Sequence, residues 1–375
     1  MAIIGGFFGG LAVFRRAYGS QNGVKMTATD LRGLPITIVG AGAIGGTVGA
    51  FLHDAGYNVT LVDIDAAHVR AINEHGLRIT GIRGDRIFRA PAIERASLRG
   101  PLGIVFLCVK GHFTADTIRD LAPLLAPDGF VLSLQNGLNE TVIAREIGPE
   151  RTVGAFVHFG ADLIEPGLIQ LGTEQTIFIG ELDGQISPRA EALRATLAHV
   201  MPARTTANIW GFLWGKLVYG ALAFAASSVD APVPAILDDR LGRAICRAAA
   251  DEAYLVASTQ AQPLEPIGEF EPNDFAPGRD AAAEGSLDAL AAAMRQSPKQ
   301  HMGIWRDLKI KRRKTEVDMQ VAVLVNKGRE IGVPTPVNSA ILDTIHAIED
   351  GKQGMGWDNF REIARRAGLN GAPAA

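Results

Sequence analysis

The feature that most constrains this chain is a glycine-rich turn at Gly40–Gly45, with the sequence GAGAIG, which directly follows the apolar run Ile36–Val39. The spacing G-x-G-x-x-G between a strand and a helix is typical of dinucleotide-binding folds. The first glycine permits a tight turn, the second lets the backbone approach a pyrophosphate, and the third lets the helix pack close to the strand. Free N–H groups at the start of the helix then favour the negative charge. The residues predicted to bind the cofactor here are Gly40, Gly42, Ala43, Ile44 and Gly45.

Asp63 bears on which dinucleotide the chain binds. It ends the next apolar run, Val59–Val62, at the position where an acid about 20 residues on binds the ribose hydroxyls. A carboxylate there would repel a 2′-phosphate, and no Arg or Lys occupies the next two positions to receive one. NAD(H) is therefore predicted over NADP(H). NADP(H) remains the alternative, because His68, Arg70 or Arg83 could fold in as phosphate partners.

The pattern beyond the glycine turn predicts two domains. Short β-rich runs such as Ile104–Val109 and Phe130–Leu134 alternate with stretches of helical spacing, which is typical of an α/β fold with a doubly wound parallel sheet of the Rossmann type. We expect this domain to span residues 34–205. Long Ala-, Leu- and Arg-rich stretches then predict an all-helical C-terminal domain over residues 206–375. Within it, Glu265–Pro298 is expected to be an irregular excursion, either a lid or disordered.

Composition excludes several other classes of protein. Lys+Arg 37 against Asp+Glu 40 gives a net charge of -3, so no basic surface for nucleic acid is predicted. Cys108 and Cys246 lie far apart in no metal-binding spacing, and neither a zinc site nor a disulfide scaffold is expected. No apolar run reaches the ~18 residues that a membrane helix needs. We expect residues 1–33 to form a disordered leader and the protein to be cytoplasmic, with apolar C-terminal helices that could support a homodimer.

Four further segments carry side chains suited to chemistry. Lys110 follows the strand IVFLCV, and Asn136 follows the strand FVLSL within the turn Gln135–Gly137. Both would lie at the carboxyl edge of a parallel sheet, where ligands bind in open α/β folds. Lys216 lies within an apolar helix, in the sequence WGKL. Glu316 lies in a charged segment that we expect to continue one long helix, Gly303–Ile331.

The order of these motifs resembles the ketopantoate reductase (2-dehydropantoate 2-reductase) family. They run GAGAIG, CVK, QNG, W-x-K-L and K-T-E-V-D, and are closed by Gly332–Pro336, with the sequence GVPTP. The glycine motif is shared by many dehydrogenases, but the complete set in this order is specific. The resemblance extends from about Pro35 to Arg366. It implies a Rossmann domain, a helical domain and hydride transfer between a nicotinamide cofactor and a 2-oxo or 2-hydroxy acid.

The resemblance also implies a role for each motif. Lys216 matches the family's catalytic lysine, the general acid that protonates the carbonyl oxygen. Glu316 matches the acid that hydrogen-bonds the substrate's hydroxyl, while Asn136 and Lys110 match positions near nicotinamide and substrate. Physically, hydride addition to a ketone builds negative charge on oxygen, which an ammonium can stabilise and protonate. Partial burial would also lower the pKa of such a lysine towards working pH.

Structural interpretations of the same residues remain open. Lys216 could be a surface residue whose stem lies along an apolar helix. Glu316 could pair with Arg312 or Arg313 one turn away. Asn136 could only shape a turn, and Lys110 could be a solvated charge at the end of a strand.

The sequence departs from the family at positions that would touch the substrate. In the family, asparagines follow the catalytic lysine four and eight residues later, but here those positions hold Gly220 and Phe224. A serine-containing stretch before the last long helix is replaced by a segment with His301, Trp305 and Arg306. Arg306 could hold a carboxylate in a bidentate fork, while His301 and Trp305 could equally be surface and packing residues. Fewer amides and more aromatic surface favour a larger or less polar substrate.

The sequence thus predicts an NAD(P)-dependent oxidoreductase that resembles 2-dehydropantoate 2-reductase and needs a small-molecule substrate but no metal. One alternative is a family member that acts as an NAD-dependent dehydrogenase of a larger or more aromatic secondary alcohol. Another, of a different class, is a dinucleotide-binding regulatory protein without catalysis.

Overall fold

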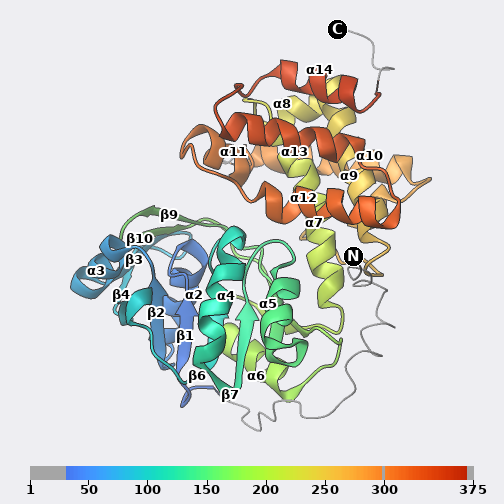
Figure 1. Ribbon diagram of the computed structural model, residues 1–375. Helices are drawn as coiled ribbons and strands as arrows, with labels where there is room; N and C mark the ends of the chain where they lie inside the picture. Colours follow the sequence, from blue (N-terminus) through green and yellow to red (C-terminus); the bar gives the residue numbers. More distant parts are fainter. Residues whose placement is uncertain (1–30, 298–299, 370–375) are drawn as a thin grey trace, which may run out of the picture. The chain divides into compact units, whose positions relative to one another are not determined.

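A computed structural model of the chain describes residues 31–297 and 300–369, which form two compact units that divide between Ile209 and Trp210 (Figure 1). Most of the predicted leader lies outside the described residues. Leu31, however, is fully buried in the core of the first unit. The ordered part of that unit therefore begins before residue 34, the predicted start of the domain.

In the described part of the chain, the first unit contains an eight-stranded sheet with the order β12-β11-β8-β7-β6-β1-β2-β5. Six neighbouring strands of this sheet pair in parallel, in the order β8-β7-β6-β1-β2-β5. Next to them, β11 pairs with β8 antiparallel. This confirms the predicted doubly wound sheet, whose order reverses between β1 and β6. The strands are β1 (Ile36–Val39), β2 (Val59–Asp63), β5 (Ala92–Glu94), β6 (Leu102–Leu107), β7 (Leu125–Ser133), β8 (Thr152–Phe156), β11 (Ile177–Glu181) and β12 (Ala203–Thr205).

Alternate residues of the central strands pack into two separate cores. In β6, Ile104 and Phe106 belong to one core, and Val105 and Leu107 belong to the other. Side chains of α2, α3 and α6 pack into the first core, and those of α4 and α5 pack into the second. Burial on both faces explains why these strands are continuously apolar. The helices are α2 (Ala43–Asp54), α3 (Ala66–His75), α4 (Thr114–Leu121), α5 (Asn139–Ile147) and α6 (Pro188–Leu197).

A smaller sheet, with the order β4-β3-β10-β9, joins two segments of the first unit that are far apart in the sequence. Its β3 and β10 pair in parallel, and the outer pairs are antiparallel. The turn between β9 and β10 contains Gly167, which has a positive φ of +80°. The strands are β3 (Leu77–Gly81), β4 (Arg86–Phe88), β9 (Ala161–Glu165) and β10 (Leu168–Leu171).

The second unit is helical, as predicted. By length and composition helix α7 could cross a membrane, although Lys216 interrupts its apolar run; 83% of its apolar 18-residue stretch is buried inside the structure, as in a core helix. The helices are α7 (Ile209–Ser227), α8 (Val233–Asp238), α9 (Arg240–Ala257), α10 (Asp280–Gln296), α11 (Gly303–Lys309), α12 (Val317–Ile331), α13 (Pro336–Glu349) and α14 (Trp357–Arg366).

The single long helix predicted over Gly303–Ile331 is wrong. Helix α11 ends at Lys309 and α12 begins at Val317. Between them, Arg312 has a φ of +45°, which a continuous α-helix cannot contain. The intervening residues 311–314 are all cationic, and their mutual repulsion disfavours a helical run.

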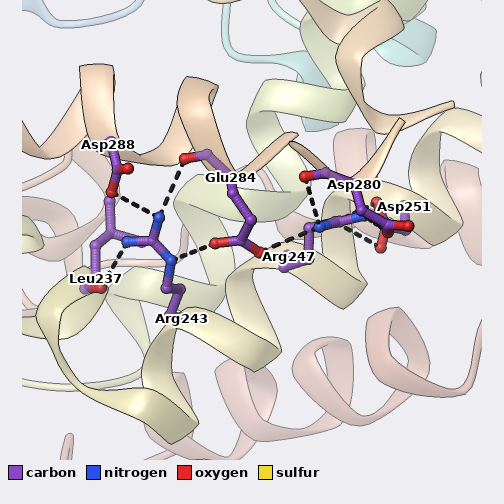
Figure 2. Close-up of polar contacts among 7 residues, drawn as sticks. All are labelled: Leu237, Arg243, Arg247, Asp251, Asp280, Glu284 and Asp288. Atoms are coloured by element: carbon purple, nitrogen blue, oxygen red, sulfur yellow. Dashed lines mark hydrogen bonds and ion pairs between the residues drawn. The ribbon is translucent and has the colours of Figure 1, made fainter. Parts of the chain in front are cut away.

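The predicted irregular excursion at Glu265–Pro298 is wrong for α10 (Asp280–Gln296), which charges attach to α9. Arg243 donates to Glu284 Oε2 at 2.6 Å and to Asp288 Oδ1 at 2.6 Å. Arg247 pairs with Asp251 on its own helix at 2.9 Å. As Figure 2 shows, Arg247 also reaches the start of α10, where it pairs with Asp280 at 2.7 Å and with Glu284 at 3.1 Å. This segment is therefore a packed helix.

Candidate functional site

The glycine-rich turn is packed tightly against the end of β6. Gly40 has a φ of +95°, and a β-carbon placed on it would lie 2.8 Å from the Cys108 carbonyl carbon. A β-carbon on Gly45 would lie 2.0 Å from the Gly40 carbonyl oxygen. Neither position can accept a side chain without backbone movement. In contrast, no atom lies within 4 Å of a β-carbon placed on Gly42, so the backbone there is open to a ligand.

Helix α2 begins directly after this turn and presents its N-terminus beside the reversal point of the sheet. Gly42 is its N-cap, Ala43 and Ile44 are half-buried in its first turn, and that turn contains no acidic residue. The positive end of the helix dipole is therefore not neutralised by a side chain of its own first turn. This arrangement suits a pyrophosphate bound across the carboxyl ends of β1 and β6.

Asp63 is fixed at the carboxyl end of β2 by two backbone N–H groups. Its Oδ2 accepts from Ala41 N–H at 2.7 Å, and its Oδ1 accepts from Asp65 N–H at 3.0 Å. The half-buried carboxylate thus lies against the glycine-rich turn. Each oxygen of an ionised carboxylate can accept more than one hydrogen bond, so the group can still accept from ribose hydroxyls.

His68 bonds to the other backbone group of Ala41, its carbonyl, a role that the sequence did not reveal. The side chain is 1% exposed, with Nε2 2.9 Å from the Ala41 carbonyl oxygen. Gly167 N–H donates to Nδ1 at 2.9 Å, from the turn between β9 and β10. Because Nδ1 accepts, Nε2 carries the proton and donates to Ala41. Asp63 and His68 together fix both backbone groups of Ala41 within the glycine-rich turn.

Two of the three side chains considered as partners of a 2′-phosphate are committed elsewhere. Both ring nitrogens of His68 bond to backbone groups. Arg83 pairs with Glu174 and donates to the Val200 carbonyl at 2.7 Å. Arg70 is exposed on α3. Of these three side chains, Arg70 makes no such contact with the described residues.

Lys110 and Asn136 lie in the turns that follow β6 and β7. Lys110 is exposed and precedes a short 3-10 helix, and Asn136 is half-buried. Gln135 joins the two turns, because its Nε2 donates to the Val109 carbonyl at 2.8 Å and to Thr114 Oγ1 at 2.7 Å. The neighbouring strands thus carry both predicted residues at one sheet edge. Gln135 is a structural partner that sequence reasoning did not identify.

The cysteines and the acidic residues offer no other chemistry in this unit. Cys108 follows β6 next to the glycine-rich turn, and burial raises the pKa of its thiol above the ordinary value. A thiol in that state is a poor nucleophile. Within residues 31–297 and 300–369, no group of three or more His, Cys, Asp or Glu could hold a metal ion.

In the second unit, Lys216 is half-buried on α7 beside a closely packed loop. A β-carbon on Gly215 would lie 2.7 Å from the Glu265 carbonyl oxygen, and Glu265 N–H donates to the Gly211 carbonyl at 3.1 Å. Glycine at position 215 therefore lets this loop lie directly against the helix that carries the lysine.

Glu316 is the half-buried N-cap residue of α12. Arg313 pairs with Asp307 at 2.7 Å, and the alternative that Glu316 pairs with Arg312 or Arg313 stays a prediction. Thr315, just before it, is held by Glu349 of α13, whose Oε1 accepts from Thr315 N–H at 2.7 Å. The start of α12 is therefore anchored independently of the Glu316 side chain.

Gly220 and Phe224, the two positions on α7 where the sequence departs from the family, lie in different surroundings from those that the sequence suggested. Gly220 is buried, and a β-carbon there would lie 2.7 Å from Gln320 Oε1 on α12. The space freed by glycine is therefore filled by a glutamine. Phe224 is fully buried, which is the position of a packing residue, and a contact with substrate would require its neighbours to move.

The structure brings His301 and Trp305 together at the start of α11. Their rings stack with centroids 4.0 Å apart, and Trp305 Nε1 donates to Asp230 Oδ1 at 2.8 Å. Hydrogen bonds from Lys309 and then Trp305 lower the pKa of Asp230. Arg306 is half-buried on the same helix. His301 and Trp305 therefore have structural partners, and a substrate role for them stays a prediction.

Comparisons with known proteins agree with this architecture. The family model described as ketopantoate reductase PanE/ApbA matches residues 36–184, and the model of its C-terminal part matches residues 208–349. A 2-dehydropantoate 2-reductase of Mesorhizobium japonicum is 28% identical over 346 residues, covering 85% of this chain and 99% of the relative. One from Archaeoglobus fulgidus is 28% identical over 326 residues, covering 84% and 98%.

Solved structures show the same fold. A PanE/ApbA family ketopantoate reductase from Ralstonia eutropha has a TM-score of 0.72 and 25% identity, with 85% of this chain and 100% of that chain covered. A ternary structure of D-mandelate dehydrogenase with NADH and anilino(oxo)acetate has a TM-score of 0.73 and 24% identity, with 85% and 99% covered. The matches to both family models and to full-length relatives show that the chain belongs to the ketopantoate reductase family.

Proposed function

We propose that this protein is an NAD-dependent oxidoreductase that transfers hydride between the cofactor and a 2-oxo or 2-hydroxy acid. Membership of the family supports an NAD(P)-dependent oxidoreductase of the ketopantoate reductase type. The names of the relatives make 2-dehydropantoate the first substrate to test.

The observation that carries the proposal is that both backbone groups of Ala41 are fixed. Asp63 accepts from its N–H at 2.7 Å, and His68 lies 2.9 Å from its carbonyl oxygen. Ala41 lies between Gly40, which permits the tight turn, and Gly42, whose backbone would approach a pyrophosphate. Asp63 therefore supports the backbone of the turn and presents a carboxylate where a ribose would lie, which favours NAD(H) over NADP(H).

The residues of the second unit would supply the proton and hold the substrate. When bound, the nicotinamide supplies or accepts the hydride. In reduction, Lys216 would donate a proton from Nζ to the carbonyl oxygen as negative charge develops there. In oxidation, the neutral amine would accept that proton. Glu316 would accept a hydrogen bond from the substrate's hydroxyl, with Lys110 and Asn136 supporting from the sheet edge.

The size of the substrate is the finer part of the proposal. The argument for a larger or more aromatic substrate assumed open space at Gly220 and an exposed ring at Phe224. Gln320 occupies the first position and Phe224 is fully buried, so a small, polar 2-oxo acid is favoured. A bulkier secondary alcohol is the second candidate. It draws support from the likeness in fold to D-mandelate dehydrogenase.

The test is a turnover assay that follows NADH and NADPH separately with 2-dehydropantoate and then with phenylglyoxylate. We expect NADH-linked reduction of 2-dehydropantoate, and loss of turnover but not of NADH binding in Lys216→Met. Lys352→Met is the matched control, because Lys352 is 72% exposed and pairs only locally with Asp350. Turnover with phenylglyoxylate alone would favour the second candidate. NADH binding without turnover of any 2-oxo acid would favour a non-catalytic regulator and overturn the proposal.

A further inference from the structure

Gly220 and Gln320 form a contact between the two helices that carry the predicted catalytic residues. Lys216 and Gly220 are four residues apart on α7, and Glu316 and Gln320 are four residues apart at the start of α12. Residues at this spacing share one face of a helix. The contact at Gly220 and Gln320 therefore turns these two faces towards each other, with Lys216 and Glu316 each about one turn away.

The Gln320 carboxamide occupies the space that a side chain at position 220 would need. A β-carbon on Gly220 would lie 2.7 Å from Gln320 Oε1 and 3.8 Å from its Cδ. Any residue larger than glycine at position 220 would therefore displace the carboxamide from its present position. An asparagine at 220, as other family members carry, would therefore require the Gln320 carboxamide, at the end of a flexible side chain, to turn away.

Glycine at 220 together with glutamine at 320 keeps a carboxamide group at this contact, in place of the asparagine that other family members carry at 220. Asparagine and glutamine end in the same carboxamide, which can accept through oxygen and donate through nitrogen. Glycine removes that group from α7, and Gln320 restores one from the facing helix. Gln320 is half-buried, so its amide is partly shielded from water, where a hydrogen bond discriminates more strongly than at an exposed site.

We propose that Gln320 determines substrate specificity by hydrogen-bonding the terminal hydroxyl of a small hydroxylated 2-oxo acid. The proposal rests on the function proposed above. The position favours a neutral hydroxyl over the substrate's carboxylate, because Glu316 one turn away on the same face would repel a second anion. Gln320 thus takes over, from α12, the recognition that an asparagine of α7 would supply.

The experiment compares two acids that differ only in that hydroxyl, 2-dehydropantoate and trimethylpyruvate. We expect Gln320→Leu, which keeps most of the side-chain volume, to reduce kcat/KM for 2-dehydropantoate about tenfold and for trimethylpyruvate much less. The double variant Gly220→Asn with Gln320→Ala moves the amide back to α7 and should recover most of the discrimination. Asn326→Leu is the control, because Asn326 is an exposed amide on the same helix.

The outcomes separate this proposal from the function on which it rests. If wild-type protein reduces 2-dehydropantoate but Gln320→Leu discriminates between the two acids as wild type does, Gln320 has no role in specificity and only this proposal fails. An equal loss for both acids in Gln320→Leu, without recovery in the double variant, would show a structural role and also overturn it. If wild-type protein reduces neither acid, the proposed function fails and this proposal fails with it.

Discussion

Replacing Asp63 by asparagine tests how the glycine-rich turn selects its cofactor. The variant keeps the shape of the side chain but removes its charge. A hydrogen bond to a charged group contributes ~1.5–3 kcal/mol, so losing the charged acceptor for ribose should weaken NADH binding by about 10- to 150-fold. The same change removes the repulsion of a 2′-phosphate, so NADPH binding should stay the same or become tighter.

The replacement also acts on the fold, and the structure gives the size of that effect. Asp63 accepts from both Ala41 N–H and Asp65 N–H, whereas an asparagine has one acceptor oxygen and would turn its NH₂ group towards one of these donors. Ala41 is fully buried, and a buried donor left without a partner costs ~1–3 kcal/mol. We therefore expect reduced stability together with the loss of NADH affinity.

Fluorescence titration with NADH and NADPH measures the first effect, and urea denaturation measures the second. Asp85→Asn is the matched control, because Asp85 pairs at the surface with Arg78 through half-exposed side chains. Unchanged NADH affinity in Asp63→Asn would refute the reasoning. So would wild-type protein that binds NADPH as tightly as NADH.

Three other expectations follow from named contacts. His68→Leu leaves Ala41 C=O and a distant backbone N–H without partners, so NADH affinity and stability should both fall by about tenfold or more; His68→Gln, which keeps a donor and an acceptor, should recover part of both. Arg247→Met should lower the free energy of unfolding in urea by ~1–2 kcal/mol, because its carboxylate partners are partly exposed; an unchanged midpoint would show that α10 is held without this network. Burial raises the pKa of Cys246 to about 12 and also raises that of Cys108, so at least the fully buried Cys246 should not react with Ellman's reagent at pH 8 until urea unfolds the chain, and fast native labelling of both thiols would contradict its burial.

Much of the first unit could be predicted because its determinants are local. The turn at Gly40–Gly45 follows a strand and opens a helix within one short segment, and each glycine is required by its own neighbours. Strands buried on both faces are continuously apolar, so they stand out from the helices between them. Asp63 is found by counting from the turn. The small sheet of β3, β4, β9 and β10 was not predicted, since it pairs segments that are far apart in the sequence.

The contacts that could not be predicted depend on segments far apart in the chain. His68 bonds to Gly167, 99 positions further along the chain, and no local pattern near either residue predicts the pair. The packing of α10 involves Arg243 and Arg247 of α9. In the sequence, these two charges look like those of any solvated helix face, and only the structure shows that α10 lies opposite them. Gly220 similarly looks like lost polarity when it is considered alone, because Gln320, which fills its space, lies on another helix.

The cofactor turn could be predicted better than the substrate-facing residues because the first is made of backbone and the second of side chains. The cofactor turn is made largely of backbone, and a residue such as Gly45 cannot change without moving the Gly40 carbonyl. The face between α7 and α12 is made of side chains, and there one carboxamide can leave α7 when another arrives on α12. On the proposal made above for Gln320, α12 supplies the polar group that would meet the substrate, although relatives 28% identical match the chain over most of its length. A substrate prediction that compares one helix at a time will miss such an exchange, because the unit that must be compared is the pair Gly220 and Gln320.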